Sequence, residues 1–367
     1  MNKDEIIAIL RLQSIPNIGD VTAKKIIRHC GNPTAIFRYK KQDLLQIDGI
    51  GLHTIKYLHE TFYLEVAQKE YEYIKKENIA CVYFLDDDYP QQLMHAIDGP
   101  LLLFKRGAIN IKNKRLVSVV GTRKITSYGS AFCEKFIEEI APLNPVIVSG
   151  FAYGVDICIQ RLAVKYGLQT IGCLAHGLNQ IYPKTHAKYM ADIEKNGGFY
   201  TEFKSTSTPE RKNFLKRNRI IAGMSEATVV IESAQKGGSL VTADIANSYN
   251  KDVFAVPGRA QDKYSIGCNN LIKQQKAHML TSAADLIYLL GWQLDERKTK
   301  TIQKQLFVNL DETEEKIHLY LQTAGKQLLD VIALECNLPI FKVSSTLLTM
   351  EMKGVIKPLP GKLFEAI

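Results

Sequence analysis

The sequence predicts an α/β protein built on a Rossmann-like parallel sheet, with a helical domain before the sheet and a winged-helix-like domain after it. Three observations support this prediction. Short apolar runs alternate with helix-length stretches between residues 111 and 292, two similar glycine-containing phrases lie within residues 1–62, and residues 310–367 show three helical patterns and a hairpin. A length of 367 residues fits two or three domains.

The first 62 residues contain the phrases "IPNIGDVTAKKII" and "IDGIGLHTIKYL", each a glycine turn followed by an amphipathic helical pattern. They resemble a tandem helix-hairpin-helix module, in which glycine lets a backbone turn approach a DNA phosphate. Asn17 stands where that pattern has an earlier glycine, and the second copy has few basic residues beyond Lys56. A helical packing domain without DNA contacts is an equal alternative.

Residues 63–110 read as a connecting helix and two leading strands, "IACVYFLD" and "LLLFKRG". The apolar runs between 111 and 292 are "RLVSVVG", "PVIVSG", "QTIGCLA", "GFYTEF", "ATVVIES" and "DVFAVPG". Continuous apolar strands that alternate with helices are typical of a parallel sheet covered on both faces. We therefore expect the Rossmann-like domain to span 111–292.

The polar, basic stretch 293–309 reads as a linker, and 310–367 as a winged-helix-like domain. Its expected recognition helix, "FKVSSTLLTMEMKG", offers only Lys342 and small hydroxyls before it turns apolar. That is too little for base recognition in a DNA groove. We expect this helix to make protein contacts or to pack within its domain.

Composition indicates an anionic partner and argues against several other classes. The net charge is +9, with 47 basic and 38 acidic residues. The seven cysteines are scattered without a C-x-x-C pair, and there is no H-E-x-x-H, so we expect neither disulfides nor a metal. Because there is no long apolar run and no signal-peptide pattern, we expect a cytosolic protein without membrane contact.

The loops at the carboxyl ends of the strands are where ligands bind in an open parallel sheet. The first of them, "VVGTRKITSYG", lacks the G-x-G-x-x-G pattern that lets a backbone approach a pyrophosphate. It presents Arg123 instead, whose planar guanidinium suits phosphate. Taken alone, this arginine also fits a solvated or ion-paired side chain.

A second candidate is the helical stretch "ERKNFLKRNRIIAG". Arg211, Phe214 and either Arg217 or Asn218 are spaced three or four apart and share a face, and Arg219 adds a further charge. An aromatic ring among cations suits single-stranded nucleic acid, because bases stack on the ring while phosphates meet the charges. The alternative is a solvated basic helix with Phe214 in the core.

Two more loops complete the candidate site. In "ESAQKGGSLVTADIANSY", Gly237, Gly238 and Ser239 open a helix whose bare N–H groups make an anion site. In "HGLNQIYPKTH", Lys184 lies near the start of another helix and offers a cation at the same edge of the sheet.

These motifs, together with "SGFAYGVD" and "GCNNLI", resemble the DNA-processing protein A family, DprA or Smf, in order and spacing over about residues 100–290. The resemblance implies a bacterial protein that binds single-stranded DNA during natural transformation, forms a homodimer through the Rossmann-like domain, and loads the RecA recombinase. It implies no enzymatic turnover and no nucleotide cofactor. The family positions that line the DNA pocket match Arg123, Arg211, Phe214, Arg217, Asn218 and Arg219, its anion turn matches Gly237, Gly238 and Ser239, and Lys184 follows the Tyr-Pro pair.

Two points follow from that resemblance. The family's anion turn usually reads Ser-Gly-Ser, whereas this chain has Lys236 before Gly237-Gly238-Ser239. We also expect the RecA-binding surface to overlap the dimer surface around 267–290.

The alternative function is a nucleotide phosphoribohydrolase on a related fold. That reaction needs a glutamate where this chain has Asp244.

Overall fold

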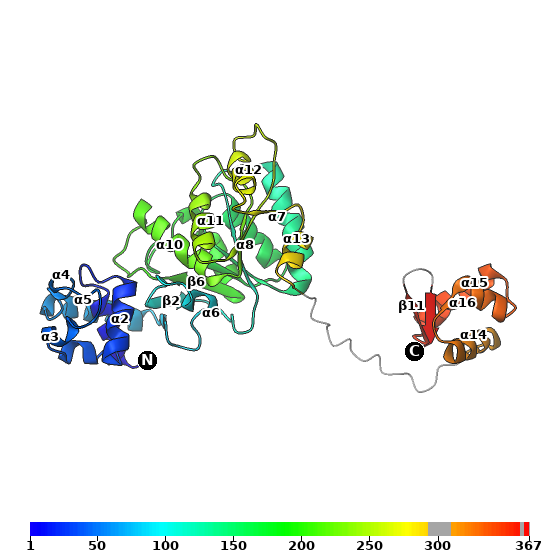
Figure 1. Cartoon of the computed structure of the whole chain (residues 1–367), viewed down its shortest axis with the longest axis horizontal. Coiled ribbons are helices and arrows are strands. Elements are labelled where there is room, and N and C mark those ends of the chain that lie inside the picture. The colour runs from blue at the N-terminus through cyan, green and yellow to red at the C-terminus, as the bar shows by residue number, and fades with distance from the viewer. Residues whose placement is uncertain (293–309, 360–362, 367) are drawn as a thin grey trace. The chain divides into compact units, whose positions relative to one another are not determined.

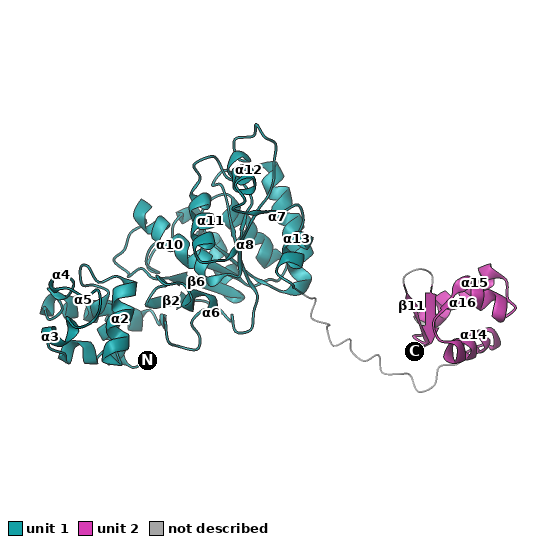
Figure 2. Ribbon diagram, viewed as in Figure 1, with its two compact units in different colours: residues 1–293 teal, residues 294–367 magenta. Residues whose placement is uncertain are grey.

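A computed structural model describes residues 1–292, 310–359 and 363–366. The chain forms two compact units, 1–293 and 294–367 (Figures 1 and 2). The predicted linker at 293–309 lies outside the described residues. Each unit is described by itself below.

The first unit opens with a helical part. It comprises α1 (Lys3–Leu12), α2 (Asp20–Cys30), the 3₁₀ helix η1 (Ala35–Arg38), α3 (Lys41–Leu44), α4 (Leu52–Ile55) and α5 (Thr61–Lys76). Gly19 and Gly51 directly precede α2 and α4, where the two glycine phrases place them, although α4 has only four residues. Helix α5 packs against α1 and buries Ala67 and Ile74. It therefore belongs to the helical part and does not merely connect two domains.

A nine-stranded sheet follows, in the order β1-β2-β6-β5-β4-β3-β7-β8-β9. Its strands are β1 (Ala80–Tyr83), β2 (Leu102–Arg106), β3 (Leu116–Val120), β4 (Val146–Ser149), β5 (Thr170–Cys173), β6 (Gly197–Thr201), β7 (Ala227–Val230), β8 (Asp252–Ala255) and β9 (His278–Met279). Strands β6 through β9 in that order are parallel, which confirms the predicted sheet. Strand β2 runs antiparallel to both β1 and β6. The sheet thus begins at Ala80, earlier than the expected boundary at 111.

Helices cover both faces of the sheet (Figure 1). In β3, Val117 and Val119 pack in one core with α7 (Ser127–Ile140), α8 (Val155–Lys165) and α13 (Ala283–Leu289). The alternate residues Leu116 and Val120 belong to the other core, with α9 (Ala187–Lys195), α10 (Arg211–Met224), α11 (Gly238–Ser248) and α12 (Ile266–Lys273). Short helices α6 (Gln91–Met94), η2 (Ala141–Leu143) and η3 (Lys184–His186) complete the unit.

The strand order reverses between β3 and β7, because the chain builds β4 to β6 on one side of β3 and β7 to β9 on the other. The loops that follow β3 and β7 therefore part from each other and leave a crevice at the carboxyl end of the sheet. This is the position at which open parallel sheets bind ligands.

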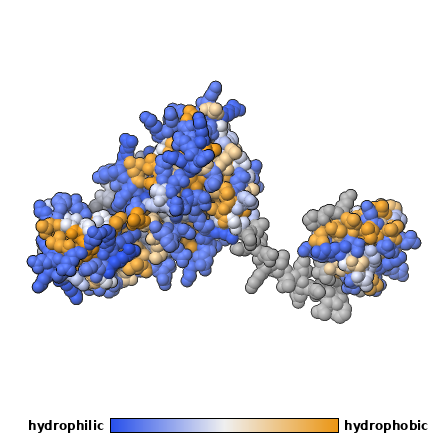
Figure 3. All heavy atoms as spheres, viewed as in Figure 1, coloured by the Kyte–Doolittle hydropathy of each residue, from blue (hydrophilic) through white to orange (hydrophobic). Residues whose placement is uncertain are grey.

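The second unit is a winged-helix domain. It has helices α14 (Glu312–Ala324), α15 (Leu329–Glu335) and α16 (Ile340–Met352), and a three-stranded sheet of β10 (Gln327–Leu328), β12 (Leu363–Ala366) and β11 (Ile356–Leu359). The three predicted helices and the terminal hairpin are confirmed. Apolar side chains gather on the visible face of this unit (Figure 3), and its exposed apolar residues include Leu334 and Phe341.

Across the described parts of both units, no single helix is long and apolar enough to span a membrane. Only α15 and α16 taken together reach that length, and they are bent by 110° relative to each other.

Candidate functional site

A cavity of about 670 Å³ opens at the crevice between β3 and β7. Its wall is built from the loop after β3, one face of α10, and the glycine turn before α11. The lining residues include Gly121, Thr122, Arg123, Asp156, Tyr182, Arg211, Phe214, Arg217, Asn218, Lys236, Gly237, Gly238 and Ser239. Most of the predicted site residues therefore meet in one cavity.

The loop that carries Arg123 is held by backbone contacts on both sides. The Thr122 N–H donates to the Glu232 carbonyl at 2.7 Å, and the Thr122 carbonyl accepts from the Val155 N–H at 3.1 Å. Gly154 has a φ of +77°, and a Cβ there would lie 2.1 Å from the Thr122 carbonyl oxygen. Only glycine permits this close approach, so the turn before α8 fixes the backbone from which Arg123 extends.

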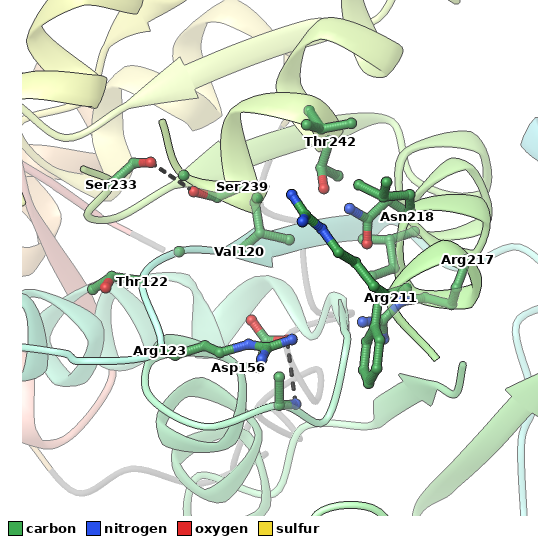
Figure 4. Close-up of a pocket in the computed structure, with 18 of the residues that line it drawn as sticks. Val120, Thr122, Arg123, Asp156, Arg211, Arg217, Asn218, Ser233, Ser239 and Thr242 are labelled. Carbon is green, nitrogen blue, oxygen red and sulfur yellow. Dashed lines mark hydrogen bonds between the residues drawn. The ribbon is translucent and has the colours of Figure 1, made fainter. Parts of the chain in front are cut away.

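Helix α10 contributes an aromatic ring between guanidinium groups. The Phe214 ring is half-buried, and its centroid lies 5.2 Å from the Arg123 guanidinium and 5.9 Å from that of Arg217. Arg123 and Arg211 are exposed and extend from opposite sides into the same space (Figure 4). The Tyr182 ring meets the Phe214 ring edge-on, with centroids 5.6 Å apart. The cavity thus combines exposed cations with an aromatic surface.

Arg217 forms the floor of the cavity. Its residue is 3% exposed, and Nη1 donates to the Gly150 carbonyl at 2.6 Å and to the Cys173 carbonyl, at the ends of β4 and β5. Burial lowers the pKa of Arg217. Burial also raises the pKa of the nearby Asp156 carboxyl, while the Arg217 guanidinium opposes that rise. Arg217 therefore ties two strand ends together at the floor, where its charge lies beside that of Asp156.

The glycine turn opens α11 with free donors. Gly237 is the residue before the helix, and a Cβ there would lie 2.1 Å from Ser233 Oγ. Ser239 Oγ donates to Ser233 Oγ at 2.9 Å, which fixes the turn. The N–H groups of Gly238 and Ser239 have no hydrogen-bond partner among the described residues. These donors and the helix dipole favour an anion at this point. A Cβ on Gly238 would meet nothing within 4 Å, so close packing does not explain that glycine.

The expectation that Arg219 lines the same pocket is wrong. Arg219 is two residues from Arg217, which places it about 200° around the helix axis. Its guanidinium is buried against Asp20 Oδ2 at 3.1 Å and Glu202 Oε2, and it donates to the Asp98 carbonyl. It connects α10 to the helical part and does not face the cavity.

Two further residues lie away from the lining. Lys184 is exposed in η3 and is not among the lining residues, whereas Tyr182, two positions earlier, is. Asp244, the residue at the glutamate position of the phosphoribohydrolase pattern, pairs with Lys276 Nζ at 3.1 Å outside the cavity. Sequence reasoning missed Tyr182, although an aromatic residue beside the predicted cation is a usable signal for a base-stacking surface.

Comparison with known proteins agrees with this architecture. Residues 80–291 match the family model described as DNA recombination-mediator protein A, and residues 310–362 match the DprA winged helix domain. The chain belongs to the DNA recombination-mediator protein A family. This confirms the resemblance found in the sequence motifs.

Relatives in this family include Protein Smf of Escherichia coli, 32% identical over 282 residues and 74% of each chain. DNA processing protein DprA of Bacillus subtilis is 34% identical over 65% of this chain and 80% of that protein. The X-ray structure of DNA processing protein A from Streptococcus pneumoniae superimposes with a TM-score of 0.65 and 28% identity, covering 78% of this chain and 98% of that one. A Helicobacter pylori relative, solved for its single-stranded DNA binding mode, gives a TM-score of 0.52 and 28% identity over 58% of this chain and 95% of that one.

Proposed function

We propose that this family member binds single-stranded DNA in the cavity between the loops after β3 and β7. The observation that carries the proposal is the composition of the lining. Arg123, Arg211, Arg217 and Lys236 line the cavity together with Phe214, and the one acidic group in the lining, Asp156, is buried beside Arg217. Membership of the family and the single-stranded DNA binding mode described for the Helicobacter pylori relative support it.

Each lining group has a distinct role in this proposal. Arg123 and Arg211 donate forked, charge-assisted hydrogen bonds to phosphates, and Lys236 adds a third exposed cation. The free N–H groups at the start of α11 receive a further phosphate oxygen. The Phe214 ring packs against a base, which contributes about 1–3 kcal/mol. Arg217 stays on its carbonyl partners and acts through its charge.

Preference for single strands follows from the same arrangement. The bases of a duplex are already stacked and shielded, so they offer no free face to Phe214. Contacts from three exposed cations to a single strand give a log-log salt dependence of affinity with a slope near −2.

Fluorescence anisotropy with labelled oligo-dT and a matched duplex tests the proposal. Arg123→Ala is expected to weaken oligo-dT binding roughly tenfold, the effect of losing about 1.4 kcal/mol. Lys112→Ala is the control, because this exposed lysine does not line the cavity. Equal affinity for both DNA forms, or wild-type binding by Arg123→Ala, refutes the proposal.

The family resemblance further supports homodimer formation and RecA loading through overlapping surfaces around 267–290. In this region Met279 is 53% exposed, Tyr288 85% and Leu289 46%, next to the edge strand β9. Exposed apolar residues beside a sheet edge suit a protein partner. Tyr288→Glu is expected to give a monomer in light scattering and to impair RecA-dependent strand exchange. A monomeric variant with full RecA loading contradicts the overlap.

A further inference from the structure

A second cavity, of about 720 Å³, lies next to the first. Consecutive parts of the same two loops line both. The loop after β3 gives residues 121–123 to the first cavity, and the same loop and the start of α7 give 126–128 to the second. The loop after β7 gives Ser233 to the first cavity and Glu232 to the second. The remaining wall of the second cavity is the segment 258–265.

This segment is held in place by specific hydrogen bonds. The Asn269 side chain pairs with both the N–H and the carbonyl of Gly258, at 3.1 and 3.0 Å. The Ser233 N–H donates to the Tyr264 carbonyl at 2.7 Å, and the Gly267 N–H donates to the Ser233 carbonyl at 2.9 Å. Ser233, which lines the first cavity, therefore holds this wall of the second cavity in place.

The lining of the second cavity offers cations and aromatic rings. Arg259 and Lys263 are exposed, and neither forms an ion pair within the part of the chain that the structure describes. Lys263 Nζ lies 5.8 Å from the centroid of the Tyr264 ring. The Tyr128 ring is 49% exposed and is fixed by its hydroxyl, which donates to the Pro257 carbonyl at 2.7 Å. Two rings beside two unpaired cations match the needs of a nucleotide.

Polar groups in this cavity also lack partners. The Ser265 residue is 5% exposed, and its hydroxyl has no hydrogen-bond partner among residues 1–292. The N–H groups of Ser127 and Tyr128, at the start of the 14-residue helix α7, are likewise unpaired there. Of the two acids, Glu232 is buried and accepts from the Thr126 N–H at 2.9 Å, so only Asp262 offers an exposed negative charge.

We infer that the second cavity holds the neighbouring nucleotides of the same DNA strand that the first cavity binds, with Arg259 and Lys263 on phosphates and Tyr128 or Tyr264 against a base. This inference rests on the proposed function. The shared walls carry it, because a strand that leaves the first cavity over the loop after β3 enters the second directly. The unpaired donors then receive the phosphate and base oxygens of that strand.

The test is anisotropy with the full chain and oligo-dT from about 4 to about 16 nucleotides. The double substitution Arg259→Ala/Lys263→Ala is expected to leave the shortest oligonucleotides unaffected and to weaken the longest about tenfold, with the salt slope smaller by about 1.4. Lys112→Ala again serves as the control, an exposed lysine outside both cavities. Asp262→Asn is expected to strengthen binding of the longest oligonucleotides, because it removes the exposed acid.

Two results overturn the inference: unchanged affinity of the double variant at every length, or an equal loss at every length. Arg123→Ala, measured in parallel, separates the two hypotheses. If Arg123→Ala binds weakly while Arg259→Ala/Lys263→Ala binds normally, the first cavity stands and the second does not. If Arg123→Ala binds like the wild type, the proposed function itself fails.

Discussion

Replacing Arg217 by methionine tests whether a buried charge pair supports the floor of the cavity. The substitution keeps the length of the side chain and removes its donors to the Gly150 and Cys173 carbonyls. It also leaves the Asp156 carboxylate, 7% exposed, without its neighbouring cation. Stranding one buried charge costs about 3–5 kcal/mol, so we expect a loss of that size in the free energy of unfolding near pH 7.

The loss depends on pH in a definite direction. Burial already raises the pKa of Asp156, and without Arg217 it rises further. A carboxyl whose pKa is higher in the folded than in the unfolded chain destabilises the fold as pH increases from the unfolded pKa, about 3.9, to the folded value. The cost of Arg217→Met is therefore smallest in acid, grows between the pKa of Asp156 in the folded wild type and its higher pKa in the folded variant, and is constant above the latter.

Urea unfolding followed by Trp292 fluorescence measures this effect, since Trp292 is the single tryptophan and is buried in the first unit. Adding Asp156→Asn to Arg217→Met is expected to restore a large part of the lost stability at pH 7, because it removes the stranded charge. A loss below about 1 kcal/mol, or one that Asp156→Asn leaves unchanged, refutes the role assigned to the pair.

Four further substitutions have distinct expected outcomes. Arg211→Ala is expected to weaken oligo-dT binding roughly tenfold. The control is Lys212→Ala, which is expected to leave the affinity unchanged because the adjacent Lys212 lies outside the cavity lining. Equal effects of the two substitutions contradict a binding role for the cavity lining. Phe214→Leu is expected to preserve the melting temperature and to lose about 1–3 kcal/mol of binding, and full retention of affinity argues against base contact. Gly154→Ala is expected to cost at least about 1–2 kcal/mol of stability and to weaken DNA binding, because the added Cβ displaces the loop after β3. A variant that matches the wild type in both assays refutes this role of Gly154. Burial lowers the pKa of Lys204 to about 8, so its contribution makes the fold more stable as pH rises from about 8 to about 10.4. Lys204→Met is expected to abolish that rise in urea titrations, and an unchanged pH profile disproves it.

The parallel sheet was predictable because its strands are buried on both faces and read as continuous apolar runs. Strands β1 and β2 were recognised as strands, but their membership of the sheet was not, since the antiparallel pairing of β2 with β6 depends on residues far along the chain. The Rossmann-like domain was expected to begin at residue 111, which left β1 and β2 outside it. In the same way, a helical pattern at 63–76 does not reveal that its apolar face packs on α1.

In the candidate site, too, features that depend on local sequence were predictable and contacts between distant residues were not. Helical spacing predicted that Arg211, Phe214 and either Arg217 or Asn218 share a face, and these residues line one cavity, because helical periodicity is local. The charge of Arg219 looked equivalent in the sequence, yet its acidic partner Asp20 lies 199 residues away and only the fold brings them together. Tyr182 was missed for a related reason, since its contact with Phe214 joins the loop before η3 to helix α10, which lies farther along the chain.

The hydrogen bonds of Asp20 and Glu70 join the helical part to the rest of the first unit, which carries the cavity. Asp20 accepts hydrogen bonds from Arg219 and from the Leu101 N–H at 2.9 Å, and Glu70 accepts from the Ser205 N–H at 2.8 Å. The range that matches the family model begins only at residue 80. A chain shortened to that range keeps every side chain that lines the cavity and loses the hydrogen bonds that Asp20 and Glu70 accept. We therefore expect the first 76 residues to stabilise the cavity wall, although none of them lines the first cavity.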